Sequence, residues 1–271
     1  MESAAYRIAR VALAGLAGLI LLYLILPAFV VVPLSFSGQN YLSFPPESWS
    51  LKWYHRMAEN SAWLDAVINS LLIGVPTAVL SMVLGTLAAI TVTRGGFSWA
   101  GMASAIVVAP MMMPHVILAI GLYPVMLDLG LLRSHFAAII GHTAIGFPLV
   151  FITVSASLTG YSGALELAAM TLGANLWQTF WKVTFPMIRI GVIVGGILAF
   201  ATSFDELMLS LFLTGASTRT LPRLIWEQLS DFLTPTIAAV ATLVFAFTLV
   251  MLAVVALLQW SAARRTGGAH G

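Results

Sequence analysis

Long apolar runs separated by shorter polar stretches make up most of this chain. Six runs are long enough to cross a membrane as helices, because about 20 apolar residues span a hydrocarbon core of roughly 30 Å. They cover residues 11–32, 66–93, 95–127, 136–158, 188–213 and 237–260. The pattern predicts an all-α membrane protein with six transmembrane helices in a single domain over residues 1–271.

Two of these runs carry features that bear on helix geometry. The third run contains three prolines, Pro110, Pro114 and Pro124. Proline removes a backbone hydrogen bond, so we expect this span to be bent, with its freed carbonyls facing protein or water. The fifth run contains Gly191-x-x-x-Gly195, a spacing that lets two helices approach closely.

The stretch 166–186 departs from the apolar pattern. Polar residues alternate with apolar ones at helical spacing, and they are Glu166, Thr171, Asn175, Gln178 and Lys182. Gly173 stands in the middle and Pro186 at the end. This predicts a short amphipathic helix, a turn and a second helix leading into the fifth span. A polar hairpin between two spans, within a loop over 159–187, offers a surface to a soluble partner.

Two other polar connections are predicted to carry short helices. The first connection, 33–63, is expected to form one around residues 51–57. The second, 214–235, is expected to form one from Pro222 to Phe232.

Composition supports the membrane assignment and excludes several functions. The chain has 271 residues, of which 60% are hydrophobic and 8% charged, against about 25% charged in soluble domains. The formal charge of +2 and the lack of a basic cluster argue against nucleic acid. The absence of cysteine excludes thiolate metal sites and cysteine catalysis. No phosphate-binding G-x-x-x-x-G-K-[ST] loop occurs, so ATP hydrolysis must come from another chain.

The basic residues favour one orientation. Six spans place both termini on one side, together with seven basic residues: Arg7, Arg10, Arg94, Lys182, Arg189, Arg264 and Arg265. The other side has five: Lys52, Arg56, Arg133, Arg219 and Arg223. By the positive-inside rule the termini and the 166–186 hairpin are expected in the cytoplasm.

The hairpin resembles the cytoplasmic "EAA" loop of permease subunits in type I bacterial ABC importers. The matching residues are Ala168, Ala169, Leu172, Gly173, Ala174, Phe180, Val183 and Pro186, placed after the fourth span as in that family. Aligned on Gly173, the family's glutamate falls at Leu167, and Glu166 stands one residue earlier. A step of one residue along a helix turns the side chain by about 100°. We therefore expect Glu166 to point in a different direction from the glutamate of that family.

The resemblance implies a MetI-like fold and a set of partners. The hairpin would be a coupling helix that docks on a cytoplasmic ABC ATPase dimer, which binds the ATP and magnesium. Implied coupling residues are Glu166, Leu167, Ala168, Ala169, Leu172, Gly173, Ala174, Phe180 and Pro186. Further implied partners are a second permease subunit, in a heterodimer or a homodimer, and a periplasmic or extracellular solute-binding protein docking on 33–63 and 214–235. The chain itself would be a multi-pass protein of the bacterial inner membrane and no enzyme.

Within this family, residues 66–260 are similar to the second permease subunit of spermidine/putrescine importers. The matching segments are Asn69-Ser70, Met113-Pro114, Ser203 to Glu206, Leu221-Pro222, Pro235 and Ala241-Thr242. His115 stands where that group often has an acid. A polyamine-like or other small organic cation is therefore the implied substrate, with an amino acid derivative or organophosphonate as the alternative. An ion-coupled secondary transporter is the alternative of another class, but no inverted repeat is visible.

Asp205 and Glu206 are adjacent acids within an apolar run. Carboxylates in hydrocarbon cost about 2.5–3.5 kcal/mol each, so these two should face a cavity or a partner. They are candidates for lining a cation pathway with His115, and Phe204 or Trp226 would add cation–π contacts. The alternative is a structural pair that holds helices together. His115 and His142 are expected to be hydrogen-bond partners between helices rather than metal ligands.

Overall fold

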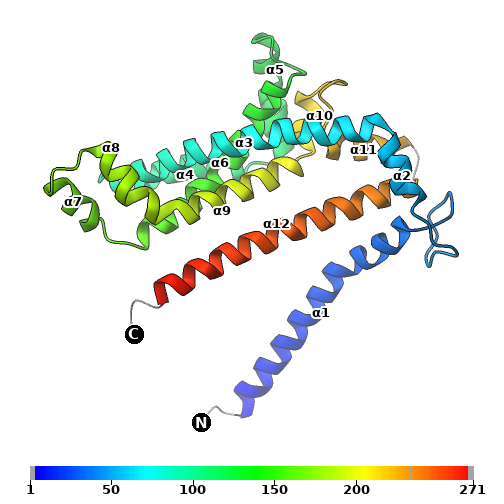
Figure 1. Ribbon diagram of the computed structural model, residues 1–271, viewed down its shortest axis with the longest axis horizontal. Coiled ribbons are helices and arrows are strands. Elements are labelled where there is room, and N and C mark those ends of the chain that lie inside the picture. Colours follow the sequence, from blue (N-terminus) through cyan, green and yellow to red (C-terminus); the bar gives the residue numbers. More distant parts are fainter. Residues whose placement is uncertain (1–3, 232–233, 268–271) are drawn as a thin grey trace. The chain divides into compact units, whose positions relative to one another are not determined.

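The computed structural model describes residues 4–231 and 234–267, which fold mainly as helices (Figure 1). Within these ranges five continuous helices are long and apolar enough to cross a membrane. They are α1 (Ala4–Ser35), α3 (Ser61–Arg94), α6 (His135–Thr159), the helix that ends as α9 (Phe185–Phe204), and α12 (Pro235–Gly267). A bent pair, α4 (Ala100–Met112) and α5 (His115–Asp128), is apolar enough over its combined length, so the number rises to six if the pair counts as one span. The predicted all-helical fold with its apolar spans is confirmed.

The third span is interrupted where the sequence predicts a bend. α4 and α5 meet at 96° across Met113 and Pro114. Met113 is extended (φ −79°, ψ 141°), as the residue before a proline prefers, and Pro114 then begins α5 as its N-cap. The steric demand of Pro114 on Met113 therefore breaks the helix at this point.

The fifth span differs from the expected continuous helix over 188–213. α9 ends at Phe204, and the short α10 (Met208–Leu213) begins after three intervening residues. Asp205 has left helical geometry (φ −96°, ψ 3°), and the Glu206 carboxylate accepts a hydrogen bond from Leu209 N at 3.0 Å. The two acids thus end one helix and satisfy a free N–H at the start of the next.

The chain separates into two compact units, Met1–Ser61 with Glu227–Thr248, and Ala62–Trp226 with Leu249–Gly271. In the first, α2 (Lys52–Glu59) confirms the short helix expected around 51–57. Trp53 of α2 is 3% exposed and donates from Nε1 to the Ser37 carbonyl at 2.8 Å. This bond holds α2 against the loop that follows α1.

The core of the second unit is the contact between α6 and α9. Buried apolar residues of both helices form one cluster with Ala89 of α3: Val150, Phe151, Val154, Leu158, Ile188, Val192 and Ala199. A Cβ added to Gly195 would lie 2.7 Å from the Cα of Val150 and would also meet the Thr153 hydroxyl. The close approach predicted from Gly191-x-x-x-Gly195 is confirmed.

The connection at 214–235 also forms a helix. α11 spans Leu221–Asp231, in agreement with the helix expected to begin at Pro222. The predicted last residue of that helix, Phe232, lies outside the described residues. Leu221 N donates to the Ser70 hydroxyl at 2.8 Å, which ties the start of α11 to α3.

Candidate functional site

The stretch 166–186 forms the predicted helical hairpin at one end of α9 (Figure 1). α7 (Ala164–Thr171) ends in a Schellman motif, in which Ala174 N donates to the Ala169 carbonyl and Gly173 N to the Met170 carbonyl, both at 3.0 Å. Gly173 has φ +92°, and no atom outside its own chain neighbours lies within 4 Å of its ideal Cβ position. The glycine is therefore required for backbone conformation and not for space.

The second limb of the hairpin runs without a break into the fifth span. α8 (Leu176–Thr179) begins with a capping box between Asn175 and Gln178. A π-helical turn, η1 (Phe180–Thr184), joins α8 to α9. Because α8, η1 and α9 are one continuous helix, a displacement of the hairpin acts directly on the membrane-spanning part.

The hairpin exposes large apolar side chains. Leu172 is 88% exposed, and Leu167, Leu176 and Trp177 are also exposed. Of the other expected coupling residues, Ala168 and Pro186 are exposed, whereas Ala169, Ala174 and Phe180 are half-buried. A concentration of apolar side chains on a short polar-flanked hairpin is typical of a surface that another protein covers.

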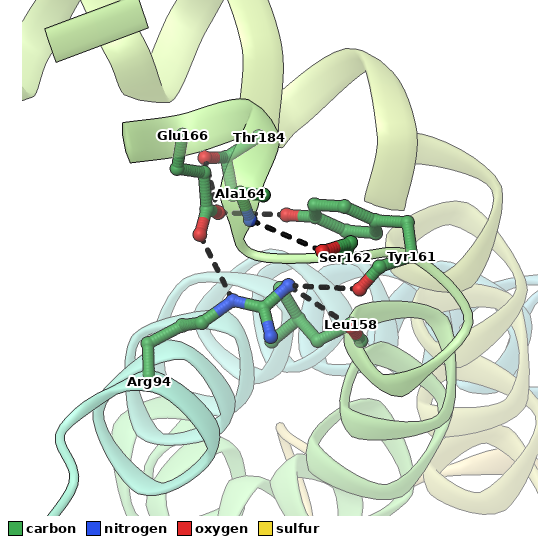
Figure 2. A network of polar contacts seen from close by, with 7 residues as sticks. All are labelled: Arg94, Leu158, Tyr161, Ser162, Ala164, Glu166 and Thr184. Atoms are coloured by element: carbon green, nitrogen blue, oxygen red, sulfur yellow. Dashed lines mark hydrogen bonds and ion pairs between the residues drawn. The ribbon is translucent and has the colours of Figure 1, made fainter. Parts of the chain in front are cut away.

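Glu166 differs from these neighbours because its carboxylate has partners within the chain (Figure 2). Oε2 lies 2.9 Å from Nε of Arg94, the last residue of α3. Oε1 accepts hydrogen bonds from the Tyr161 and Thr184 hydroxyls, each at 2.8 Å. Both carboxylate oxygens of a residue expected at a partner interface are thus engaged internally.

Arg94 and Tyr161 complete this network, which sequence reasoning missed. The Arg94 guanidinium also donates to the carbonyls of Leu158, at 3.0 Å, and Tyr161, at 3.4 Å, and lies 4.8 Å from the centre of the Tyr161 ring. Burial and the hydrogen bond to Glu166 raise the pKa of Tyr161, so the phenol stays protonated as a donor. The only sequence signal was the opposite charge of Arg94 and Glu166.

A cavity of about 550 Å³ lies beside the network, between the end of α3 and the hairpin. Its walls are mostly apolar and include Ile90, Met170 and Phe180, with Arg94, Glu166 and Thr184 along one side. α7 is therefore not packed tightly against α3.

A second site forms where the two interrupted spans meet. His115, the first residue of α5, places Nδ1 2.6 Å from Oε2 of Glu206 in the gap between α9 and α10. Glu206 is 6% exposed and its other oxygen caps α10, whereas Asp205 is exposed. The structure thus brings together His115 and Glu206 from the expected pathway set, whereas Asp205, next to Glu206 in the chain, is exposed.

The aromatic members of that set have different environments. Phe204 is buried and stacks on Phe200 with ring centroids 5.7 Å apart. Trp226 lies on α11 and is 48% exposed.

Two further polar side chains, His142 and Asn69, connect elements within the second unit. Buried His142 of α6 bonds through Nδ1 to the Ser203 hydroxyl at 2.8 Å and through Nε2 to the Ser210 hydroxyl at 3.4 Å. With the His115–Glu206 contact, this confirms the histidines as hydrogen-bond partners between helices. Asn69 of α3 donates to the Ser217 and Arg219 carbonyls and pairs with Nε2 of His135 at 2.8 Å. Among the described residues no group of three or more His, Cys, Asp or Glu is arranged to hold a metal ion.

Comparisons with known proteins agree with this architecture. Residues 81–266 match the family described as binding-protein-dependent transport system inner membrane component. The chain is 29% identical over 230 residues to the spermidine/putrescine transport system permease protein PotC of Haemophilus influenzae, covering 84% of this chain and 89% of PotC. It is 30% identical over 229 residues to the putrescine transport system permease protein PotI of Escherichia coli K12, covering 82% and 81%.

A solved structure shares the fold. A chain of a bacterial ABC transporter involved in the import of the acidic polysaccharide alginate superimposes with a TM-score of 0.70 at 19% identity. The likeness covers 96% of this chain and 99% of that one.

Proposed function

The chain belongs to the family of inner-membrane components of binding-protein-dependent transport systems, and from that premise we propose that it carries a polyamine-like or other small organic cation. Its class is established: it is a multi-pass inner-membrane permease subunit of a type I ABC importer, and its relatives are transport subunits rather than enzymes. This membership removes the ion-coupled secondary transporter from consideration. The substrate and the roles of individual residues are the proposal.

The observation that carries the substrate class is the position of Glu206. A carboxylate that is 6% exposed stands where α5 meets the gap between α9 and α10. Irregular backbone at membrane depth is tolerated where it is buried in protein or lines a water-filled cavity. A buried ionisable group there marks a solute pathway, and its negative charge favours a cation. The names of PotC and PotI, which refer to spermidine and putrescine, point the same way.

The His115 imidazole would compete with a substrate cation for the Glu206 carboxylate. Its imidazole occupies Oε2 of Glu206 and is 35% exposed, whereas Glu206 is nearly inaccessible. A substrate ammonium group reaching the carboxylate would take the place of the imidazole. Asp205, exposed at the end of α9, would attract the cation first, and Phe204 and Trp226 would contribute aromatic surface.

The coupling and the partners complete the proposal. The exposed apolar residues Leu167, Leu172, Leu176 and Trp177 dock on an ATPase dimer that binds the ATP and magnesium. With both termini cytoplasmic, the 33–63 and 214–235 connections face a periplasmic solute-binding protein. A second, homologous permease subunit completes the pathway, and residues 1–271 act as one permease domain. ATP-driven closure of the ATPase dimer would move the hairpin and rock the spans.

The test is uptake by the complete importer reconstituted in liposomes with its own binding protein. We expect putrescine or spermidine to be accumulated and to compete with each other, and the binding protein to bind the same compounds in calorimetry. Uptake of an amino acid derivative or an organophosphonate instead, with no competition by polyamines, would refute the cation assignment and leave the importer class intact.

A further inference from the structure

We propose that Arg94 is a positioning residue for ATP coupling: it ties the hairpin to α3 through Glu166, so that Glu166 transmits hairpin movement instead of contacting the ATPase. This rests on the proposed docking role of the hairpin. The proposed docking surface for the ATPase does not include Glu166, because the Glu166 side chain is only 13% exposed and its carboxylate is bonded within the chain.

The side chains of Arg94 and Glu166 connect α3, α6, α7 and η1 through polar contacts (Figure 2). Arg94 ends α3, donates to the Leu158 carbonyl near the end of α6 and forms an ion pair with Glu166. Glu166 lies in the first limb of the hairpin and accepts from Thr184, the last residue of η1. One ion pair with its hydrogen bonds therefore connects α3, α6 and both limbs of the hairpin.

Apolar packing does not replace this connection. α7 lies wholly within the described residues and buries none of its side chains. The cavity of about 550 Å³ separates it in part from the end of α3. The orientation of α7 relative to α3 therefore depends on polar contacts, and Arg94–Glu166 is the charged one among them. Replacing one residue of a partly buried ion pair leaves the charge of the other residue without a partner. The connection between α7 and α3 should therefore weaken.

The link gives the hairpin two routes into the membrane-spanning helices. One runs through η1 into α9, whose far end at Phe204 lies two residues before Glu206 in the chain. The other runs through Arg94 into α3, whose Asn69 and Ser70 hold the 217–221 segment. Without Arg94, α9 would still follow the hairpin, but α3 would not move with it. ATP hydrolysis would then continue while fewer substrate molecules cross for each ATP consumed.

The experiment compares Arg94→Ala, Glu166→Gln and the double variant in the complete importer in nanodiscs and liposomes. We expect each single variant to retain its ATPase subunits and their hydrolysis, with transport per ATP reduced about tenfold. The double variant should be no worse than either single variant, because both remove the same link. Arg189→Ala, which removes an exposed arginine near the same end of α9, is the matched control and should behave like wild type.

A second measurement does not depend on transport. Spin labels at the end of α3 and on α7 should give a narrow distance distribution in the wild type and a broad one in Arg94→Ala and Glu166→Gln. Loss of the ATPase subunits from Glu166→Gln would overturn the proposal in favour of direct docking by Glu166, and unchanged transport per ATP or additive defects would overturn it too. If the wild-type complex neither holds an ATPase nor transports, the proposed function fails, and the distance distributions still decide the Arg94–Glu166 link.

Discussion

Replacing Glu206 with glutamine removes a buried negative charge while keeping the shape of the side chain. The carboxylate makes two contacts, with His115 Nδ1 at 2.6 Å and with Leu209 N at 3.0 Å. Glutamine keeps a carbonyl oxygen for Leu209 N, so α10 retains its first hydrogen bond and the fold should persist. The charge that would hold a substrate ammonium group is lost.

The size of the effect follows from that lost charge. A hydrogen bond to a charged group contributes about 1.5–3 kcal/mol, and about 1.4 kcal/mol corresponds to a tenfold change in rate. Polyamine uptake by Glu206→Gln should therefore be roughly ten- to hundredfold slower than wild type at saturating binding protein.

The assay is accumulation of labelled putrescine by liposomes that contain the complete importer. Asp128→Asn, which removes an exposed carboxylate at the other end of α5, is the control and should retain wild-type uptake. Thermal unfolding of Glu206→Gln, followed in parallel, should match that of wild type. Uptake within twofold of wild type by a stably folded Glu206→Gln would refute the assignment of this carboxylate to the pathway.

Three further changes test other parts of the structure. Gly173→Asp places a charged residue at φ +92° beside the apolar docking surface, so co-purification should show loss of the ATPase from a variant that still inserts into the membrane; retained ATPase would count against the docking role. Gly195→Ala forces its Cβ against the Val150 backbone, and thermal denaturation should show a loss of about 1–3 kcal/mol, whereas Gly101→Ala, with open space around it, should cost nothing. Because burial and Glu166 raise the pKa of Tyr161 above its ordinary value of about 10, its hydrogen bond holds at neutral pH and loosens only as pH rises through that raised pKa. Tyr161→Phe should abolish this alkaline loosening in the distance between α3 and α7, and an unchanged alkaline transition would exclude Tyr161 as its cause.

Two neighbouring residues of the hairpin, Glu166 and Leu167, face different surroundings. Leu167 is 63% exposed at the position where the family's glutamate aligns, while Glu166 turns inward to Arg94. The one-residue displacement seen in the sequence thus has a structural counterpart. The outward position is apolar, and the charge serves the chain's own helices.

Features that depend on local chain chemistry could be predicted from the amino-acid sequence. Apolar runs longer than a bilayer is thick must form helices, because unsatisfied backbone groups cannot face lipid. Pro114 interrupts the third span through the residue before it, and Gly173 marks the hairpin turn through its positive φ. The close approach at Gly191 and Gly195 was also predictable, since small residues at helical spacing leave room for another backbone.

The pairing of polar groups, in contrast, follows only from the folded arrangement of the helices. Glu166 could have faced a partner or solvent, and only the placement of α3 beside the hairpin gave it Arg94. The fifth span is interrupted at Asp205 and Glu206, which the apolar pattern does not reveal. At the interruption the Glu206 carboxylate contacts His115 and accepts a hydrogen bond from Leu209 N. Such pairings join residues far apart in sequence, and their energies depend on the burial and geometry that folding creates, which no local pattern encodes.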